Sequence, residues 1–204
     1  MVIQELKPSK HVEGRWLAVL EDGSILRVGE GEVVEFALYA GKTLDGDEVD
    51  RLLTAARRSG LKSKAISLLM KKPQSRRELE RKLSDWEAGE EEICSICDRM
   101  EELGYLNDQE YAGRIVRHYA GKGFGERKIR DELYRRGVPR ELWDGALDQM
   151  EDHSGAIDSF LEKKLKGSQD PKDIKRASDA LARRGFSWSE IGDALRRYGM
   201  EVLD

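Results

Sequence analysis

The sequence lacks several features that define large classes of proteins. Its longest uninterrupted apolar runs, residues 16–20 and 36–40, have five residues each, far fewer than the roughly 20 that a membrane-spanning helix needs. The first ten residues, MVIQELKPSK, lack the apolar core of a secretory signal peptide. Two cysteines in 204 residues cannot form a disulfide framework. We therefore expect a protein of the reducing cytoplasm that binds no membrane.

An excess of positive charge is also missing, because 36 Lys and Arg stand against 40 Asp and Glu, a formal net charge of −4. A protein that binds nucleic acid through its overall charge needs a basic surplus to release counterions from phosphates. With 37% charged and only 7% aromatic residues, the composition favours amphipathic helices over a single large core. Any contact with nucleic acid must come from local patches.

Residues 1–44 have the pattern of a small antiparallel β segment. The runs 15–21 and 24–28 flank Asp22 and Gly23, a dipeptide that favours a tight hairpin because both positions tolerate positive φ. A third run, 32–38, follows a glycine-containing turn at residues 29–31. We expect three or four short strands, which form a sheet of marginal stability on its own.

From about residue 45 the strand patterns give way to helix signals. Ser75, Asn107 and Ser187 each stand three residues before a glutamate, the spacing of an N-terminal capping box. Prolines between periodic segments mark connections, since a missing N–H is harmless there. The patterns predict helices near residues 46–58, 62–72, 76–84, 88–103, 108–122, 126–136, 139–149, 153–167, 171–184 and 188–199.

The helical region contains an internal repeat. Residues 131–147, DELYRRGVPRELWDGAL, align with residues 179–195, DALARRGFSWSEIGDAL, at a constant offset of 48, and SRRELERKL at 75–83 is a weaker match. Small three-helix units stack on their neighbours to bury area. The prediction is a mainly α protein in which three tandem three-helix repeats form an elongated, curved array after the β segment. The expected divisions are a β segment at 1–44, a linking helix at 45–61, and repeats at 62–106, 107–151 and 152–204.

No motif in the chain indicates catalysis, a metal or a cofactor. Cys94 and Cys97 form a CxxC, but a zinc site needs two further ligands at finger-like spacing, and the histidines are isolated. The two cysteines lie on an apolar helical stripe, which favours a place in the core. Residues 41–43, GKT, lack the upstream glycine of a phosphate loop, and residues 121–125, GKGFG, follow a helix where a dinucleotide site requires a strand. We therefore expect a protein that is not an enzyme.

Basic residues are unevenly distributed despite the acidic total. Residues 114–140 hold nine Lys or Arg and three acids, a local net charge of +6, whereas residues 85–92 hold five acids. The predicted helix at 126–136 turns Ile129 and Leu133 inward and must present most of its charge to solvent. Each cluster could be an ordinary solvated face, but recurrence in stacked repeats favours a continuous basic stripe suited to phosphates or to an acidic protein surface.

Six aromatic residues accompany these clusters and could stack on bases. Their helical spacing alongside Leu and Ile favours packing in the core or between repeats. They are Tyr105, Tyr111, Tyr119, Tyr134, Trp143 and Trp188.

Three motifs in order resemble those of the RecX regulatory protein family: SRRELERKL at 75–83, LGYLNDQEYA at 103–112 and GKGFGERKIRDELYRRGV at 121–138. The resemblance covers roughly residues 62–200, and the third repeat departs from the pattern with SDAL in place of an EL motif. It implies a non-enzymatic modulator of the RecA recombinase that binds the RecA–DNA filament and restrains it. Such a protein acts in DNA repair, recombination and the SOS response.

On this basis the expected partners are the RecA filament and single-stranded DNA within or near it, bound by a monomer that needs no cofactor or metal. We expect Leu79, Leu83, Ile129 and Leu133 to be structural. A stand-alone helical DNA-binding protein, such as a transcription regulator with one helix in the major groove, is the alternative. The residues predicted to contact the filament or its DNA are Arg127, Lys128, Arg130, Arg135 and Arg136, with Arg76, Arg77, Lys163 and Lys164 in support.

Overall fold

The computed structural model describes residues 1–150 and 154–199. The chain divides into two compact units, one made of residues 1–72 with 82–100 and the other of residues 73–81 with 101–204. The architecture is mainly helical with a small antiparallel sheet at the N-terminus, as the sequence predicts. Within the described residues, no helix has the length and apolar character needed to cross a bilayer.

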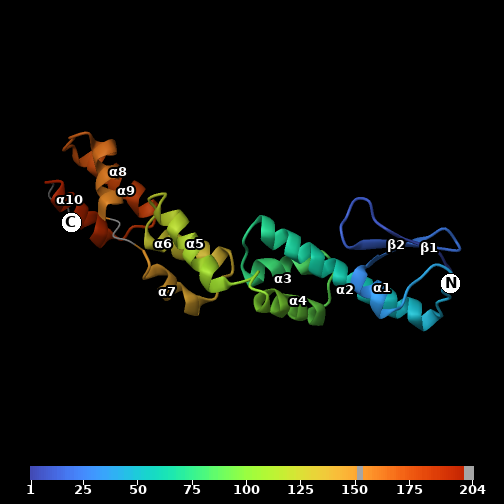
Figure 1. Cartoon of the computed structure of the whole chain (residues 1–204). Coiled ribbons are helices and arrows are strands. Elements are labelled where there is room, and N and C mark those ends of the chain that lie inside the picture. Colours follow the sequence, from blue (N-terminus) through green and yellow to red (C-terminus); the bar gives the residue numbers. More distant parts are fainter. Residues whose placement is uncertain (151–153, 200–204) are drawn as a thin grey trace. The chain divides into compact units, whose positions relative to one another are not determined.

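The first unit begins with a three-stranded sheet of order β1-β2-β3 (Figure 1). Its strands are β1 (Ile3–Pro8), β2 (Arg15–Leu20) and β3 (Ile25–Gly29). The predicted hairpin at Asp22 and Gly23 is confirmed: Gly23 has φ +81°, and β2 pairs with β3 in antiparallel register. Alternate residues of these strands, such as Ala18 and Leu20, are buried, so one face of the sheet forms the core of this unit.

The strand predicted at residues 32–38 is wrong, because Glu30–Glu35 forms the helix α1. The Glu32 carboxylate accepts a hydrogen bond from the Gly29 N–H at 2.6 Å. This contact satisfies an amide that a helix N-terminus would otherwise leave without a partner. The third strand is instead β1, which the sequence patterns did not identify.

The helices predicted at 46–58 and 62–72 are a single helix, α2 (Gly46–Lys71). Gly60 lies in its interior and does not interrupt it, since a glycine costs a helix only about 1 kcal/mol. Leu52, Leu61 and Leu69 are buried along its length, so burial on both sides of Gly60 outweighs that cost.

The remaining helices follow the predicted positions to within a few residues. They are α3 (Arg76–Asp85), α4 (Glu90–Glu102), α5 (Asp108–Ala120), α6 (Glu126–Arg135), the 3-10 turn Arg140–Leu142, α7 (Trp143–Leu147), α8 (Ser154–Leu165), α9 (Pro171–Arg183) and α10 (Trp188–Arg197). Residue 153, the predicted start of α8, lies outside the described residues.

The predicted helix starts at Ser75, Asn107 and Ser187 are confirmed. Each side chain accepts a hydrogen bond from the backbone N–H three residues further along. The carboxylates of Glu78 and Glu190 in turn accept a hydrogen bond from the backbone N–H of Ser75 and Ser187. Because these bonds satisfy amides at the helix ends, they fix where α3, α5 and α10 begin.

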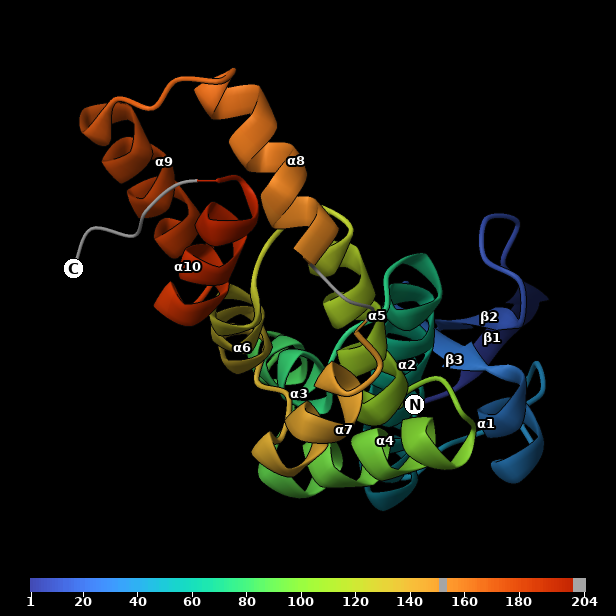
Figure 2. The same cartoon turned by 90° about the vertical axis from the view of Figure 1, so that its left-hand side faces the viewer.

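The second unit contains two hydrophobic clusters that correspond to successive repeats. One joins α5, α6 and α7 around Ile129 and Leu133, and the other joins α8, α9 and α10 around Leu161 and Leu181 (Figure 2). We call these three-helix groups repeat 2 and repeat 3. Leu79, Leu83, Ile129 and Leu133 are all fully buried, which confirms the structural role expected of them.

Candidate partner-binding surface

The structure separates the predicted binding residues into two classes, beginning with those that are held by carboxylates. Arg136 donates to Glu132 Oε1 and to the Tyr111 hydroxyl, each at 2.7 Å, and its side chain is only 21% exposed. Although burial opposes the charge, these two hydrogen bonds raise the pKa of Arg136. Arg136 is therefore largely engaged by groups of its own repeat, and its assignment as a partner contact stays a prediction.

Glu132 is the buried acceptor at the centre of this network. Arg135 and Arg136 both donate to its carboxylate. Hydrogen bonds from Arg135, the largest contribution, and from Arg136 lower the pKa of Glu132 to about 2, although burial alone would raise it. Burial also raises the pKa of Tyr111 to about 12, so the Tyr111 hydroxyl stays protonated and donates to Glu78 at 2.9 Å. The charges of this network are compensated internally.

Two more predicted residues are also held by carboxylates. Arg130 donates to Glu126 at 2.7 Å and, across the repeat, to Asp144 at 2.8 Å. Arg76 pairs with Glu80 at 3.1 Å and with Glu101 at 2.8 Å. Acids thus engage both guanidinium groups, and their assignment as partner contacts stays a prediction. The sequence shows the acids four residues away, Glu80 and Glu126, but not Glu101 and Asp144, which the fold brings near.

The second class is exposed to solvent. Arg77, Arg127, Lys163 and Lys164 are exposed, and none of their side chains forms an ion pair within residues 1–150 and 154–199. Arg135 is 69% exposed although it pairs with Glu132. Lys128 is half-buried, because its backbone and Cβ lie against Gly185. Arg77, Arg127, Arg135, Lys163 and Lys164 therefore remain available for a partner.

The exposed arginines gather where repeats meet. Gly125 and Arg127, at the start of α6, donate their N–H groups to the carbonyls of Arg184 and Gly185, at the end of α9, at 2.9 and 3.1 Å. The end of α6 meets the start of α3 in the same way, where the Ser75 hydroxyl donates to the Arg136 carbonyl. Each junction thus brings a cation from both helices, Arg183 with Arg127 and Arg135 with Arg77.

Four side chains expected to be buried are exposed instead. Cys94 is exposed, whereas Cys97 is buried in α4, because residue 94 falls one position outside the stripe formed by 93, 96, 97 and 100. Trp188 is 64% exposed, whereas Tyr111 and Trp143 are buried as predicted. Tyr105 and Tyr134 are exposed as well. The alignment of repeats could have identified Trp188, since its counterpart in repeat 2 is Arg140.

Comparison with similar proteins identifies the family to which the chain belongs. A family model described as RecX, second three-helix domain, matches residues 107–147. The chain is 34% identical over 136 residues to the regulatory protein RecX of Xanthomonas axonopodis pv. citri (strain 306), spanning 65% of this chain and 84% of that protein. It is 34% identical over 143 residues to the regulatory protein RecX of Pseudomonas entomophila (strain L48), spanning 69% and 91%.

Two solved structures share the fold. A crystal structure of regulatory protein RecX superposes with a TM-score of 0.74 at 21% identity, covering 96% of this chain and 98% of that one. The crystal structure of RecX from Lactobacillus salivarius gives a TM-score of 0.66 at 21% identity, covering 70% and 97%. The motifs at 75–83, 103–112 and 121–138, the repeated three-helix groups and these relatives agree: the chain belongs to the RecX family of regulatory proteins.

Proposed function

We propose that this chain is a non-enzymatic regulator of the RecA recombinase, which binds the RecA–DNA filament in the cytoplasm and restrains it during DNA repair, recombination and the SOS response. Its relatives are named regulatory proteins. The proposed partners are the recombinase and single-stranded DNA, and the acting species is a monomer.

One observation supports this proposal most directly: each helix that forms a junction carries an exposed arginine next to the residues in contact. Arg127 and Arg183 lie at the junction of α6 with α9, and Arg77 and Arg135 at the junction of α6 with α3. Exposed cations at more than one junction suit a filament, which repeats its own charges. Because the whole chain is acidic, this surface also favours a target made of protein and phosphate over DNA alone.

The test reverses three exposed cations that form no ion pair among the described residues, in the variant Arg77→Glu, Arg127→Glu, Arg183→Glu. We expect at least a tenfold higher concentration to be needed to inhibit the ATPase of RecA on single-stranded DNA, because the reversed charges now repel phosphates and acidic surfaces. Unfolding by denaturant should be nearly unchanged, since surface substitutions typically cost within about 0.5 kcal/mol.

The matched control makes the same change of charge in the first unit, with Lys10→Glu, Arg27→Glu and Lys71→Glu, all exposed. It should inhibit as the unmodified protein does. Equal inhibition by both variants would contradict the proposal. A footprint on duplex DNA without recombinase would instead support the alternative of a stand-alone DNA-binding protein.

A further inference from the structure

Repeat 3 carries a groove between α9 and α10 that has a volume of about 510 Å³. Ile174 and Ser178 from α9 line it, together with Ile191, Gly192 and Leu195 from α10. This volume lies within the range of about 300–1,000 Å³ that is typical of binding pockets.

The alignment of the two repeats shows why the groove is open. At the offset of 48 residues, Ile174, Ser178 and Gly192 correspond to Glu126, Arg130 and Asp144 of repeat 2. In repeat 2, Arg130 of α6 donates to Asp144 of α7 at 2.8 Å and also to Glu126 of its own helix at 2.7 Å. This ion-pair bridge ties the two helices of repeat 2 together across the surface.

Repeat 3 has none of the three groups that make the bridge. The Ser178 hydroxyl donates to the Ile174 carbonyl of its own helix at 2.9 Å, and Gly192 has no side chain. The space that charged groups fill in repeat 2 is therefore lined in repeat 3 by the apolar side chains of Ile174, Ile191 and Leu195.

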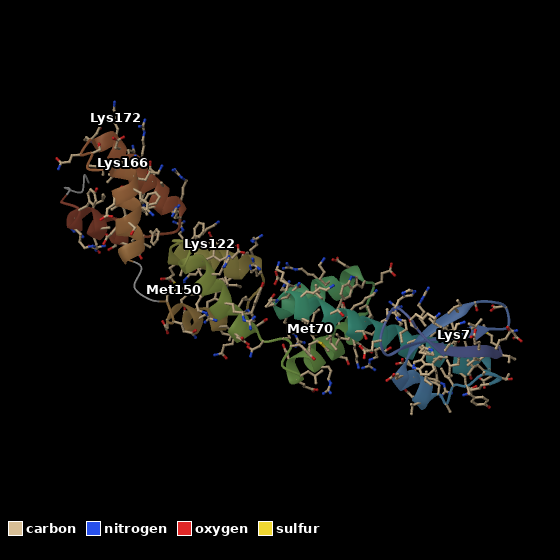
Figure 3. All side chains as sticks on the ribbon, turned by 45° about the horizontal axis from the view of Figure 1, so that its top comes forward. Lys7, Met70, Lys122, Met150, Lys166 and Lys172 are labelled. Carbon is tan, nitrogen blue, oxygen red and sulfur yellow. The ribbon has the colours of Figure 1, made fainter. Side chains whose placement is uncertain are left out.

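The rim of the groove indicates what could bind there. Trp188 forms one wall and is 64% exposed, and large exposed aromatic side chains beside an apolar surface are typical of protein interfaces. Lys172 and Lys175 also line the groove, and neither forms an ion pair with a described residue. Lys172 extends away from the ribbon near the start of α9 (Figure 3). A carboxylate next to an apolar side chain would match this pattern of charge.

We propose that this groove binds a short segment of a recombinase subunit that inserts a bulky apolar side chain and places a carboxylate beside Lys172 and Lys175. The proposal rests on the proposed function and adds a contact with protein to the cationic contacts at the junctions. A protein segment fits better than nucleic acid, because the floor of Ile174, Ile191 and Leu195 is aliphatic and favours apolar side chains.

The test closes the groove by rebuilding the bridge of repeat 2 in the variant Ser178→Arg, Gly192→Asp, which leaves the net charge unchanged. We measure binding to RecA filaments on single-stranded DNA and, separately, binding to single-stranded DNA alone. We expect filament affinity to fall at least fivefold, as expected for the loss of one buried apolar contact, while affinity for DNA alone stays the same.

A second variant tests the groove without replacing a buried residue. It is needed because Ser178 is buried and its replacement can perturb α9. Trp188→Arg installs the residue that repeat 2 has at this position, at an exposed site, and should lower filament affinity by a similar factor. The matched control, Gly60→Asp with Ser63→Arg, makes the same exchange of side chains on α2 and should bind filaments as the unmodified protein does.

The outcomes separate the two proposals. If the unmodified protein fails to bind filaments, the proposed function is wrong, and the groove assignment with it. If it binds and both groove variants bind equally well, the groove assignment alone is wrong. An equal loss of binding to DNA alone would also overturn it, since the groove would then hold nucleic acid.

Discussion

The two junctions of the second unit use the same Arg-Arg-Gly sequence in different ways. At the end of α6, Arg136 turns inward to Glu132 and Tyr111, and the Ser75 side chain reaches the Arg136 carbonyl. At the end of α9, Arg184 lies over the rings of Phe160 and Phe124, at 4.7 and 6.0 Å. Arg136 also lies 6.0 Å from the centre of the Tyr111 ring, but its hydrogen bonds make this junction the polar one, whereas aromatic rings dominate the contacts of Arg184, and we call that junction aromatic.

The backbones also approach one another to different degrees. A Cβ on Gly137 would lie 2.8 Å from Arg77 Cβ, whereas a Cβ on Gly185 would lie 2.3 Å from the backbone nitrogen of Lys128. The helices are therefore packed more closely at Gly185 than at Gly137. A repeated sequence can therefore preserve the helix-end geometry while the groups that stabilise each junction differ.

The largest effect expected is that of Gly185→Ala. Gly185 has φ +93°, and both the dihedral and the contact with Lys128 disfavour a Cβ. We expect a loss of about 3–5 kcal/mol in the free energy of unfolding, which combines the left-handed conformation with overpacking. Gly137→Ala, at φ +71°, should cost less because its closest contact, 2.8 Å, is longer than the 2.3 Å at Gly185. Chemical denaturation measures both losses.

Two controls separate the causes of that loss. Gly167 has φ +85° with open space around it, so Gly167→Ala reports the dihedral cost alone, about 1–2 kcal/mol. Gly125 has φ −81°, and its Cβ would lie 2.5 Å from the Gly185 carbonyl; Gly125→Ala therefore reports the close approach alone. If Gly185→Ala costs no more than Gly167→Ala, the tight second junction does not exist in solution.

Acid should weaken the polar junction selectively through Glu132. Its pKa of about 2 in the folded protein lies below the ordinary value of 4.5, so the stabilisation is fully present above pH 4.5 and is lost as the pH falls from 4.5 towards 2. The loss is at most about 3 kcal/mol, because a tenfold difference in proton affinity between the folded and unfolded protein corresponds to about 1.4 kcal/mol. Denaturant unfolding measured between pH 4.5 and pH 2 gives the change in the free energy of unfolding with pH.

The variant Glu132→Gln tests whether Glu132 causes this dependence of stability on pH. It should be less stable than the unmodified protein at neutral pH, and the difference should shrink as the pH falls, because both then carry a neutral group. The control Glu110→Gln removes an exposed i,i+4 pair with Arg114, which is worth roughly 0.3–0.5 kcal/mol. A difference at Glu132 that does not change with pH would contradict the charge network.

The sequence patterns were sufficient for most helices and insufficient for the cationic surface. Helix ends could be predicted because a cap at Ser75 or Ser187 acts through residues three positions away. The contacts of Arg76, Arg130 and Arg136 could be predicted only in part. Each pairs with an acid four residues away on its own helix, but their second partners, Glu101, Asp144 and Tyr111, are brought near only by the tertiary fold. Residues 32–38 were assigned wrongly for a related reason, since their apolar pattern fits a strand as well as a helix.

The smallest effect expected is that of a substitution at the aromatic junction. Comparing Arg184→Lys with Arg136→Lys tests whether the two arginines contribute differently to the free energy of unfolding. Arg184→Lys keeps the charge but loses the planar group that lies over Phe160 and Phe124, which should cost about 0.5–1 kcal/mol. Arg136→Lys should cost more, roughly 1–3 kcal/mol, because one ammonium cannot reproduce the fixed geometry in which Arg136 joins Glu132 to Tyr111. Denaturation of both variants in low and high salt completes the test. Since Arg136 is mostly shielded from solvent, salt should change neither loss of stability greatly. If Arg184→Lys costs more than Arg136→Lys, the aromatic junction is the stronger of the two.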